Sequence, residues 1–168
     1  DISQLLVEEA LKGKIVVRLK GGDPYVFGRG GEEGQLLYQN SIDFEVIPGI
    51  TSGIGGLAYA GIPITHRDHA SSLHLITGHL KSEEDELNYY ALAKLDGTLV
   101  FYMGVANLKN IAMGLCNAGK NINTPVALIS WATHPSQQTV TTTLDEIIND
   151  RFAVSIKPPS LIVVGTVI

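Results

Sequence analysis

The chain has 168 residues, of which 45% are hydrophobic and 17% charged, with a formal net charge of −5. Disordered chains combine low hydrophobicity with high charge, so this composition excludes that class and predicts one compact domain or two small ones. The acidic balance argues against a nucleic-acid partner, because neutralising phosphates requires a surplus of Lys and Arg.

In the first half of the chain, helical and strand-like apolar patterns alternate. The helical spacing of three and four begins at Ile2, directly after Asp1. A chain that opens inside a helix without Met is expected to be a fragment whose earlier part is absent. The predicted helices cover residues 2–11, 32–39 and 51–60, and the predicted strands, rich in β-branched residues, cover 15–19 and 44–47.

The second half continues this alternation. The predicted strands cover residues 72–77, 98–103, 126–130, 138–143 and 160–167, and the predicted helices cover 83–94 and 107–118. Gly119 follows the second of these helices in the usual C-terminal position, and Thr143 with Glu146 forms a capping box. The alternation predicts an α/β fold with mixed, mostly parallel sheets and flanking helices, in which 138–143 is antiparallel.

A polar run, from Thr65 to His69, is the best candidate for a boundary between two parts of the chain. We therefore predict a first α/β lobe over residues 1–68, left incomplete by the absent earlier part, and a second over 69–168.

The densest motif is the glycine-rich segment at residues 21–33. In α/β folds, ligands bind where strands end, and glycine lets the backbone approach a ligand closely. The segment is not a dinucleotide fingerprint, since the spacing from Gly28 and Gly30 requires a third glycine where Glu33 stands. The alternative is a structural turn followed by a helix start.

Four histidines, His66, His69, His74 and His79, raise the question of a metal site. On a strand, His74 and His79 would point to opposite faces, and the single cysteine leaves no thiolate pair. We therefore expect polar or substrate-facing histidines and no metal.

Cationic residues gather locally despite the acidic total. Lys14, Arg18, Lys20 and Arg29 stand against Asp23, a local charge of +3. Because Arg binds carboxylates in a bidentate manner, such a patch suits a small polycarboxylate, and Arg67 at the predicted boundary could join it. The alternative is a solvated face with surface ion pairs.

Two strand ends, residues 102–104 and 130–133, could meet the glycine-rich segment at residues 21–33 in one pocket.

The single cysteine, Cys116, cannot form an internal disulfide and is expected to fill a helix face, which fits a reducing, cytoplasmic location. The longest apolar stretch, residues 161–168, is far shorter than the roughly 20 residues of a membrane span, so no membrane is expected.

At this point a family resemblance becomes specific. The chain resembles the uroporphyrinogen-III C-methyltransferases, most clearly over residues 16–33, VVRLKGGDPYVFGRGGEE. Shorter matches follow in the same order: VIPGITS at 46–52, YAGIPITHR at 59–67, TGH at 77–79, TLVFYMGV at 98–105 and KPPSLIVVG at 157–165.

The resemblance implies a two-lobed methylase, usually a homodimer, that binds S-adenosylmethionine between its lobes and releases S-adenosylhomocysteine. Such enzymes methylate two ring carbons of uroporphyrinogen III, giving precorrin-2 for sirohaem or cobalamin. The implied cofactor contacts are Gly21, Gly22, Asp23, Val26, Thr51 and Ser52, with Met103 and Ala132 from the second lobe. For this polycarboxylate substrate, we predict Arg18, Arg29 and Arg67 as binding residues.

One departure from the family pattern leaves alternatives open. The family's opening Gly-Pro-Gly-Asp loop, and the Asp and Lys associated with proton handling, have no counterpart here, so the catalytic acid and base stay unassigned. The alternatives are a sibling methylase acting on a later corrin precursor, a remnant that only binds S-adenosylhomocysteine or tetrapyrrole, and an interaction module.

Overall fold

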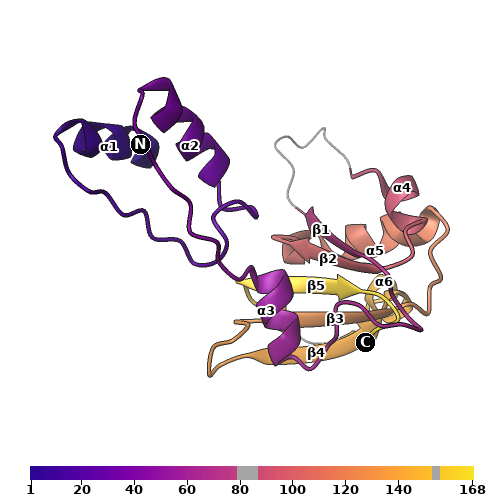
Figure 1. The fold of residues 1–168 in the computed structure, drawn as a ribbon. Coiled ribbons are helices and arrows are strands. Elements are labelled where there is room, and N and C mark those ends of the chain that lie inside the picture. The colour runs from indigo at the N-terminus through magenta and orange to yellow at the C-terminus, as the bar shows by residue number, and fades with distance from the viewer. Residues whose placement is uncertain (79–86, 153–155) are drawn as a thin grey trace. The chain divides into compact units, whose positions relative to one another are not determined.

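A computed structural model describes residues 1–78, 87–152 and 156–168 (Figure 1). The contacts within it form two compact units, Asp1–Thr51 and Ser52–Ile168. This division falls directly before the helix at Ser52–Tyr59. The lobe boundary predicted after Asp68 lies on the other side of that helix and stays a prediction. Each unit is described by itself.

The first unit contains two helices at the predicted places, α1 (Ile2–Leu11) and α2 (Gly30–Gln39). The carboxylate of Asp1 caps α1 by accepting a hydrogen bond of 3.2 Å from the amide of Ser3. Leu6 and Val7 are the buried residues of α1, which packs against α2.

The strands predicted at 15–19 and 44–47 are wrong: both segments run without strand pairing to any described residue. Ile15 is 98% exposed, and Val17 and Leu19 are also largely exposed. A β-branched run favours extended backbone, but a strand also requires a neighbour to accept and donate its hydrogen bonds. The local pattern cannot supply that neighbour.

The second unit contains a five-stranded sheet with strand order β1-β2-β5-β3-β4. The strands are β1 (Leu73–Thr77), β2 (Thr98–Tyr102), β3 (Pro125–Ser130), β4 (Gln138–Thr143) and β5 (Ser160–Val164). This confirms the predicted α/β class with a mixed sheet, and β4 is antiparallel to β3 as expected.

The pairing is less parallel than predicted, because β5 runs opposite to both of its neighbours, β2 and β3, and β1–β2 is the parallel pair. As a consequence β1, β2 and β3 share one direction. Their carboxyl ends meet at one edge of the sheet, together with the start of β5.

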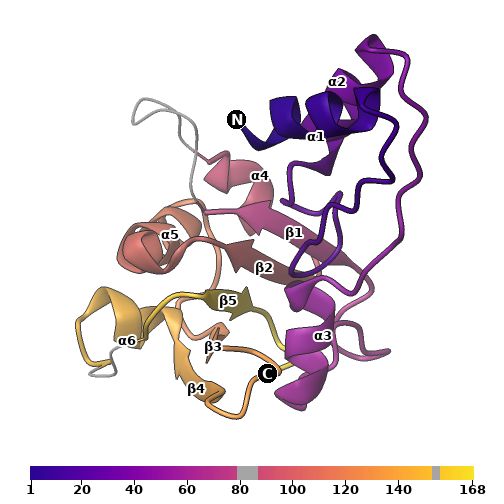
Figure 2. The same ribbon diagram turned by 90° about the vertical axis from the view of Figure 1, so that its left-hand side faces the viewer.

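Helices cover both faces of this sheet (Figure 2). One face carries α5 (Leu108–Asn117) and α6 (Leu144–Ile148), and the opposite face carries α3 (Ser52–Tyr59). The largest buried side chains between the sheet and the α5–α6 layer are Leu99, Phe101, Ile111, Leu115, Leu128, Leu144 and Ile162. Burying each of them contributes roughly 1.5–3 kcal/mol, so this core anchors the strands that form the sheet edge.

Local end signals behave as predicted in this unit. Gly119 ends α5 with a φ of +102°, and the side chain of Thr143 accepts a hydrogen bond of 3.2 Å from the amide of Glu146 at the start of α6. Cys116 is partly buried against the core, and burial, followed by the charge of Asp145, raises the pKa of its thiol.

Two predicted elements are shorter in the structure. The predicted helix 83–94 is represented by α4 (Tyr89–Ala93), and residues 83–86 lie outside the described residues. A short 3₁₀ helix, η1 (Val105–Asn107), leads into α5, and β5 ends at Val164 rather than at residue 167.

Candidate functional site

The glycine-rich loop of the first unit folds back on the carbonyl of Pro24. The amide of Gly30 donates a hydrogen bond of 3.0 Å to that carbonyl oxygen. A Cβ on Gly28 or on Gly30 would lie 2.6 Å from the same oxygen. Since real Cβ atoms do not approach this closely, both positions need glycine if the loop is to keep this shape.

Asp23 ties this loop to a second loop of the same unit. Its carboxylate accepts hydrogen bonds from the amides of Tyr25, at 2.9 Å, and Gly49, at 3.1 Å. The hydrogen bond from Gly49, followed by that from Tyr25, lowers the pKa of Asp23. A Cβ on Gly49 would lie 2.7 Å from the carbonyl oxygen of Gly22, so the two loops touch.

Within the first unit, the structure therefore brings together part of the predicted cofactor set. A Cβ on Gly22 would lie 3.8 Å from the Cα of Thr51, and Asp23 bonds to the same second loop. Gly21 is exposed, with no other group within 4 Å of its Cβ position, and Val26 is partly buried in the loop. The carboxylate of Asp23 holds the loops in place, whereas the backbone at Gly21 is open to a ligand.

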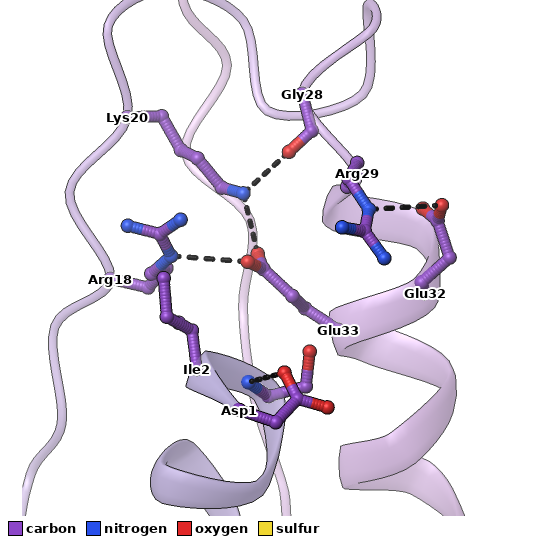
Figure 3. A pocket seen from close by; sticks show the side chains of 9 residues that line it. Asp1, Ile2, Arg18, Lys20, Gly28, Arg29, Glu32 and Glu33 are labelled. Carbon is purple, nitrogen blue, oxygen red and sulfur yellow. Dashed lines mark hydrogen bonds and ion pairs between the residues drawn. The ribbon is translucent and has the colours of Figure 1, made fainter.

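A cavity of about 130 Å³ in the first unit is lined by Arg18, Lys20 and Arg29 of the predicted cationic patch (Figure 3), whereas Lys14 pairs with Glu9 instead. The side chain of Glu33 is almost fully buried there, with one carboxylate oxygen 3.1 Å from Nε of Arg18 and the other 2.7 Å from Nζ of Lys20. Burial alone would raise the pKa of Glu33, but the hydrogen bonds and charges of Lys20 and Arg18 outweigh it and lower that pKa. The cavity therefore holds paired charges.

A second predicted substrate-binding arginine, Arg29, also forms an ion pair within the chain. Arg29 lines the same cavity as Arg18 and lies 3.6 Å from Glu32. Arg67 belongs to the second unit, is exposed, and makes no ion pair with any described residue. Arg18 and Arg29 thus share a cavity, with carboxylates of the chain itself as partners.

In the second unit, the candidate site is the sheet edge at which β1, β2 and β3 end. The amide of Gly78 donates a hydrogen bond of 2.7 Å to the carbonyl of Tyr102, and Nδ2 of Asn107 donates one of 3.1 Å to the carbonyl of Gly78. Met103 and Trp131, the residues directly after β2 and β3, are exposed and have left-handed backbones with φ of 55° and 49°. These turns place both side chains at the edge.

The start of α3 lies at the same edge. The amide of Gly53 donates a hydrogen bond of 2.6 Å to the hydroxyl of Tyr102. One turn further along, a Cβ on Gly56 would lie 2.7 Å from the Cβ of Ala132. The structure thus gathers the predicted cofactor residues of this unit, which are Ser52 before Gly53, Met103 after Tyr102, and Ala132.

Three residues at these sites were not assigned a role from the sequence. Lys20 was counted among the local cations, Glu33 breaks a dinucleotide motif, and Tyr102 stands at a predicted strand end, and all three lie in segments that resemble the methyltransferase family. The sequence signal that could have identified Tyr102 is the run of small residues in α3, since Gly53 leaves room for the Tyr102 hydroxyl.

The histidines do not cluster as metal ligands among the residues that the structure describes, where no group of three or more His, Cys, Asp or Glu side chains is suitably placed. The rings of His66 and His69 are tilted by 50° with centroids 4.8 Å apart, while Nε2 of His74 lies 3.0 Å from Oγ of Ser72. His79 lies outside the described residues.

In the described ranges no helix is both long and apolar enough to cross a membrane.

Comparison with known proteins identifies the family. Residues 1–148 match the family model of tetrapyrrole (corrin/porphyrin) methylases. Over 99% of its length, the chain is 52% identical to the uroporphyrinogen-III C-methyltransferase of Bacillus subtilis and 50% identical to a siroheme synthase of Xylella fastidiosa. The crystal structure of uroporphyrin-III C-methyl transferase from Thermus thermophilus, complexed with S-adenyl homocysteine, superposes with a TM-score of 0.86 at 37% identity, covering 99% of this chain and 72% of that one.

The chain spans 65% of the Bacillus subtilis protein and 35% of the Xylella fastidiosa protein. The family-model match nevertheless covers the first unit and the second unit as far as residue 148. The chain belongs to the tetrapyrrole methylase family.

Proposed function

We propose that the protein containing this chain transfers methyl groups from S-adenosylmethionine to two ring carbons of uroporphyrinogen III, giving precorrin-2. The observation that carries this proposal is the 52% identity to a uroporphyrinogen-III C-methyltransferase over 99% of the chain. The likeness to a siroheme synthase supports the same product, because sirohaem is made from precorrin-2.

The residues present suit an S-adenosyl ligand. Such a ligand presents hydrogen-bonding groups and a sulfur centre, which open backbone groups and polarizable side chains can contact. Gly21 has open space at its Cβ position, and Met103 offers an exposed, polarizable thioether. When bound, S-adenosylmethionine supplies a methyl group on a positively charged sulfur.

We propose the following residues as contacts of S-adenosylmethionine: Gly21, Gly22, Asp23, Val26, Thr51, Ser52, Met103 and Ala132. The role of Asp23 follows from its contacts: it fixes the two loops against each other rather than offering a free carboxylate. Loops held in this way lose little entropy when a ligand binds.

Arg18, Arg29 and Arg67 are our candidates for holding substrate carboxylates. Arg67 is the strongest of the three, because Arg18 and Arg29 already face carboxylates of the chain. A substrate carboxylate at Arg18 would have to compete with the nearly buried Glu33.

We further propose that the protein is a homodimer, as the family resemblance implies, and cytoplasmic, as its single cysteine suggests.

Product analysis tests the proposal. The protein is incubated without oxygen with uroporphyrinogen III and S-adenosylmethionine, and the product is examined by mass spectrometry. We expect the mass of two added methyl groups. Methylation of a later corrin precursor but not of uroporphyrinogen III would identify a sibling methylase, and binding of S-adenosylhomocysteine with no product would identify a chain that only binds.

A further inference from the structure

The loop at residues 21–28 is closed at its base by a single ammonium group (Figure 3). Lys20, directly before the loop, has its Nζ 2.5 Å from the carbonyl oxygen of Gly28, the last residue of the loop. The same Nζ lies 2.7 Å from the carboxylate of Glu33, which projects from α2. One side chain therefore joins both ends of the loop to a helix.

The Lys20–Glu33 pair is sheltered from solvent. The two side chains are 12% and 11% exposed, and the second oxygen of Glu33 accepts a hydrogen bond of 3.1 Å from Nε of Arg18. By contrast, the neighbouring pair Arg29–Glu32 is 3.6 Å apart, with side chains 81% and 62% exposed. Exposed pairs contribute little, whereas removing Glu33 would leave Lys20 and Arg18 without their shared carboxylate, and removing Lys20 would take this donor from the carbonyl of Gly28.

We propose that Lys20 and Glu33 are positioning residues, forming a clasp that holds the loop at residues 21–28 in the shape that receives the S-adenosyl ligand. The inference rests on the proposed function and deepens it. Neither side chain has to touch the ligand: the clasp fixes Gly28, and Gly30 beyond it bonds back to Pro24. Without the clasp, binding would have to order the loop, and that entropy cost would weaken affinity.

The experiment compares Glu33→Gln and Lys20→Met with Glu32→Gln, the adjacent acid on the same helix. In the full chain we measure the affinity for S-adenosylhomocysteine by calorimetry and the hydrogen exchange of the Gly30 and Gly49 amides. Both clasp variants are expected to speed this exchange and weaken affinity by about tenfold, which corresponds to about 1.4 kcal/mol. Glu32→Gln should match the wild type.

Lys20→Arg provides a rescue, since it keeps a cation that can reach both the Gly28 carbonyl and the Glu33 carboxylate. We expect it to retain most of the affinity that Lys20→Met loses. If Lys20 were needed only for overall stability, its substitutions would lower the melting temperature. The affinity for S-adenosylhomocysteine would then not differ between Lys20→Arg and Lys20→Met. Glu33→Gln and Lys20→Met each remove one side of the clasp. If one of these variants fails to fold, the other still tests the proposal.

Two results would overturn the inference: unchanged exchange of the Gly30 and Gly49 amides in both clasp variants, or faster exchange with unchanged affinity. If the wild-type chain does not bind S-adenosylhomocysteine, the proposed function loses its support instead. The exchange measurement then still decides whether the clasp exists.

Discussion

The amide of Gly53 donates a hydrogen bond of 2.6 Å to the hydroxyl of Tyr102. This contact joins the start of α3 to the end of β2, across 49 residues of sequence. A Cβ on Gly53 would lie 2.5 Å from the same hydroxyl oxygen, so only glycine leaves room for it. Two predicted cofactor residues are next to these partners: Ser52 precedes Gly53, and Met103 follows Tyr102. The hydrogen bond therefore fixes the backbone beside both of them.

Replacing Tyr102 with Phe removes this hydroxyl and leaves the buried amide of Gly53 without its partner. We expect the free energy of unfolding to fall by about 1–3 kcal/mol, measured by urea denaturation. Tyr59→Phe is the matched control, because Tyr59 is 73% exposed at the end of the same helix. An equal effect of both substitutions would contradict a special role for the Tyr102 hydroxyl.

Gly56→Ala tests the close approach of α3 to the residue after β3. The added methyl group would lie 2.7 Å from the Cβ of Ala132, so the helix has to shift. We expect a loss of about 1–3 kcal/mol in the free energy of unfolding, despite the better helix propensity of Ala. Gly31→Ala in α2, where the methyl group meets no atom within 4 Å, should be neutral or slightly stabilising. Tolerance of Gly56→Ala would mean that α3 packs less closely than described.

The contact between the two loops of the first unit should depend on pH through Asp23. Backbone hydrogen bonds lower its pKa in the folded state, so its carboxylate stabilises the folded loops above the ordinary value of 3.8. That contribution is lost as the pH falls through the lower folded value. We expect the carboxyl carbon of Asp23 to titrate below 3.8 in NMR, and near 3.8 in the urea-unfolded chain. Identical midpoints in the two states would show that the carboxylate does not hold the loops.

Arg67→Ala should separate substrate binding from cofactor binding. Loss of a charge-assisted hydrogen bond costs about 1.5–3 kcal/mol, so we expect KM for uroporphyrinogen III to rise by about tenfold or more. KM for S-adenosylmethionine should change little. Arg151→Ala is the control, because Arg151 is paired with Asp145. An unchanged dependence on uroporphyrinogen III would exclude Arg67 from substrate binding.

Helix ends and most strands of the second unit could be predicted because their signals are local. The side chain of Thr143 caps the amide of Glu146, and Gly119 adopts the positive φ that ends α5. The direction of β5 could not be predicted in this way. Its place between β2 and β3 depends on pairing between residues that are distant in sequence, which a single-strand pattern does not encode.

The candidate site was predicted in its chain segments but not in its side-chain contacts. The charge count identified Arg18 and Lys20 as cations, yet Glu33, 15 residues from Arg18, forms an ion pair with each of them. The strand predicted over residues 15–19 failed for a related reason, since the residues that would pair with it are not specified by its own pattern. In both cases the decisive partner lies outside the local sequence.

The most direct test of the account is a calorimetric titration of the chain with S-adenosylhomocysteine, with NADH as the control ligand. We predict binding with a Kd on the order of 1 μM for S-adenosylhomocysteine and none for NADH. Absence of S-adenosylhomocysteine binding, or equal binding of both ligands, would contradict the claim that the residues of this chain form an S-adenosyl site.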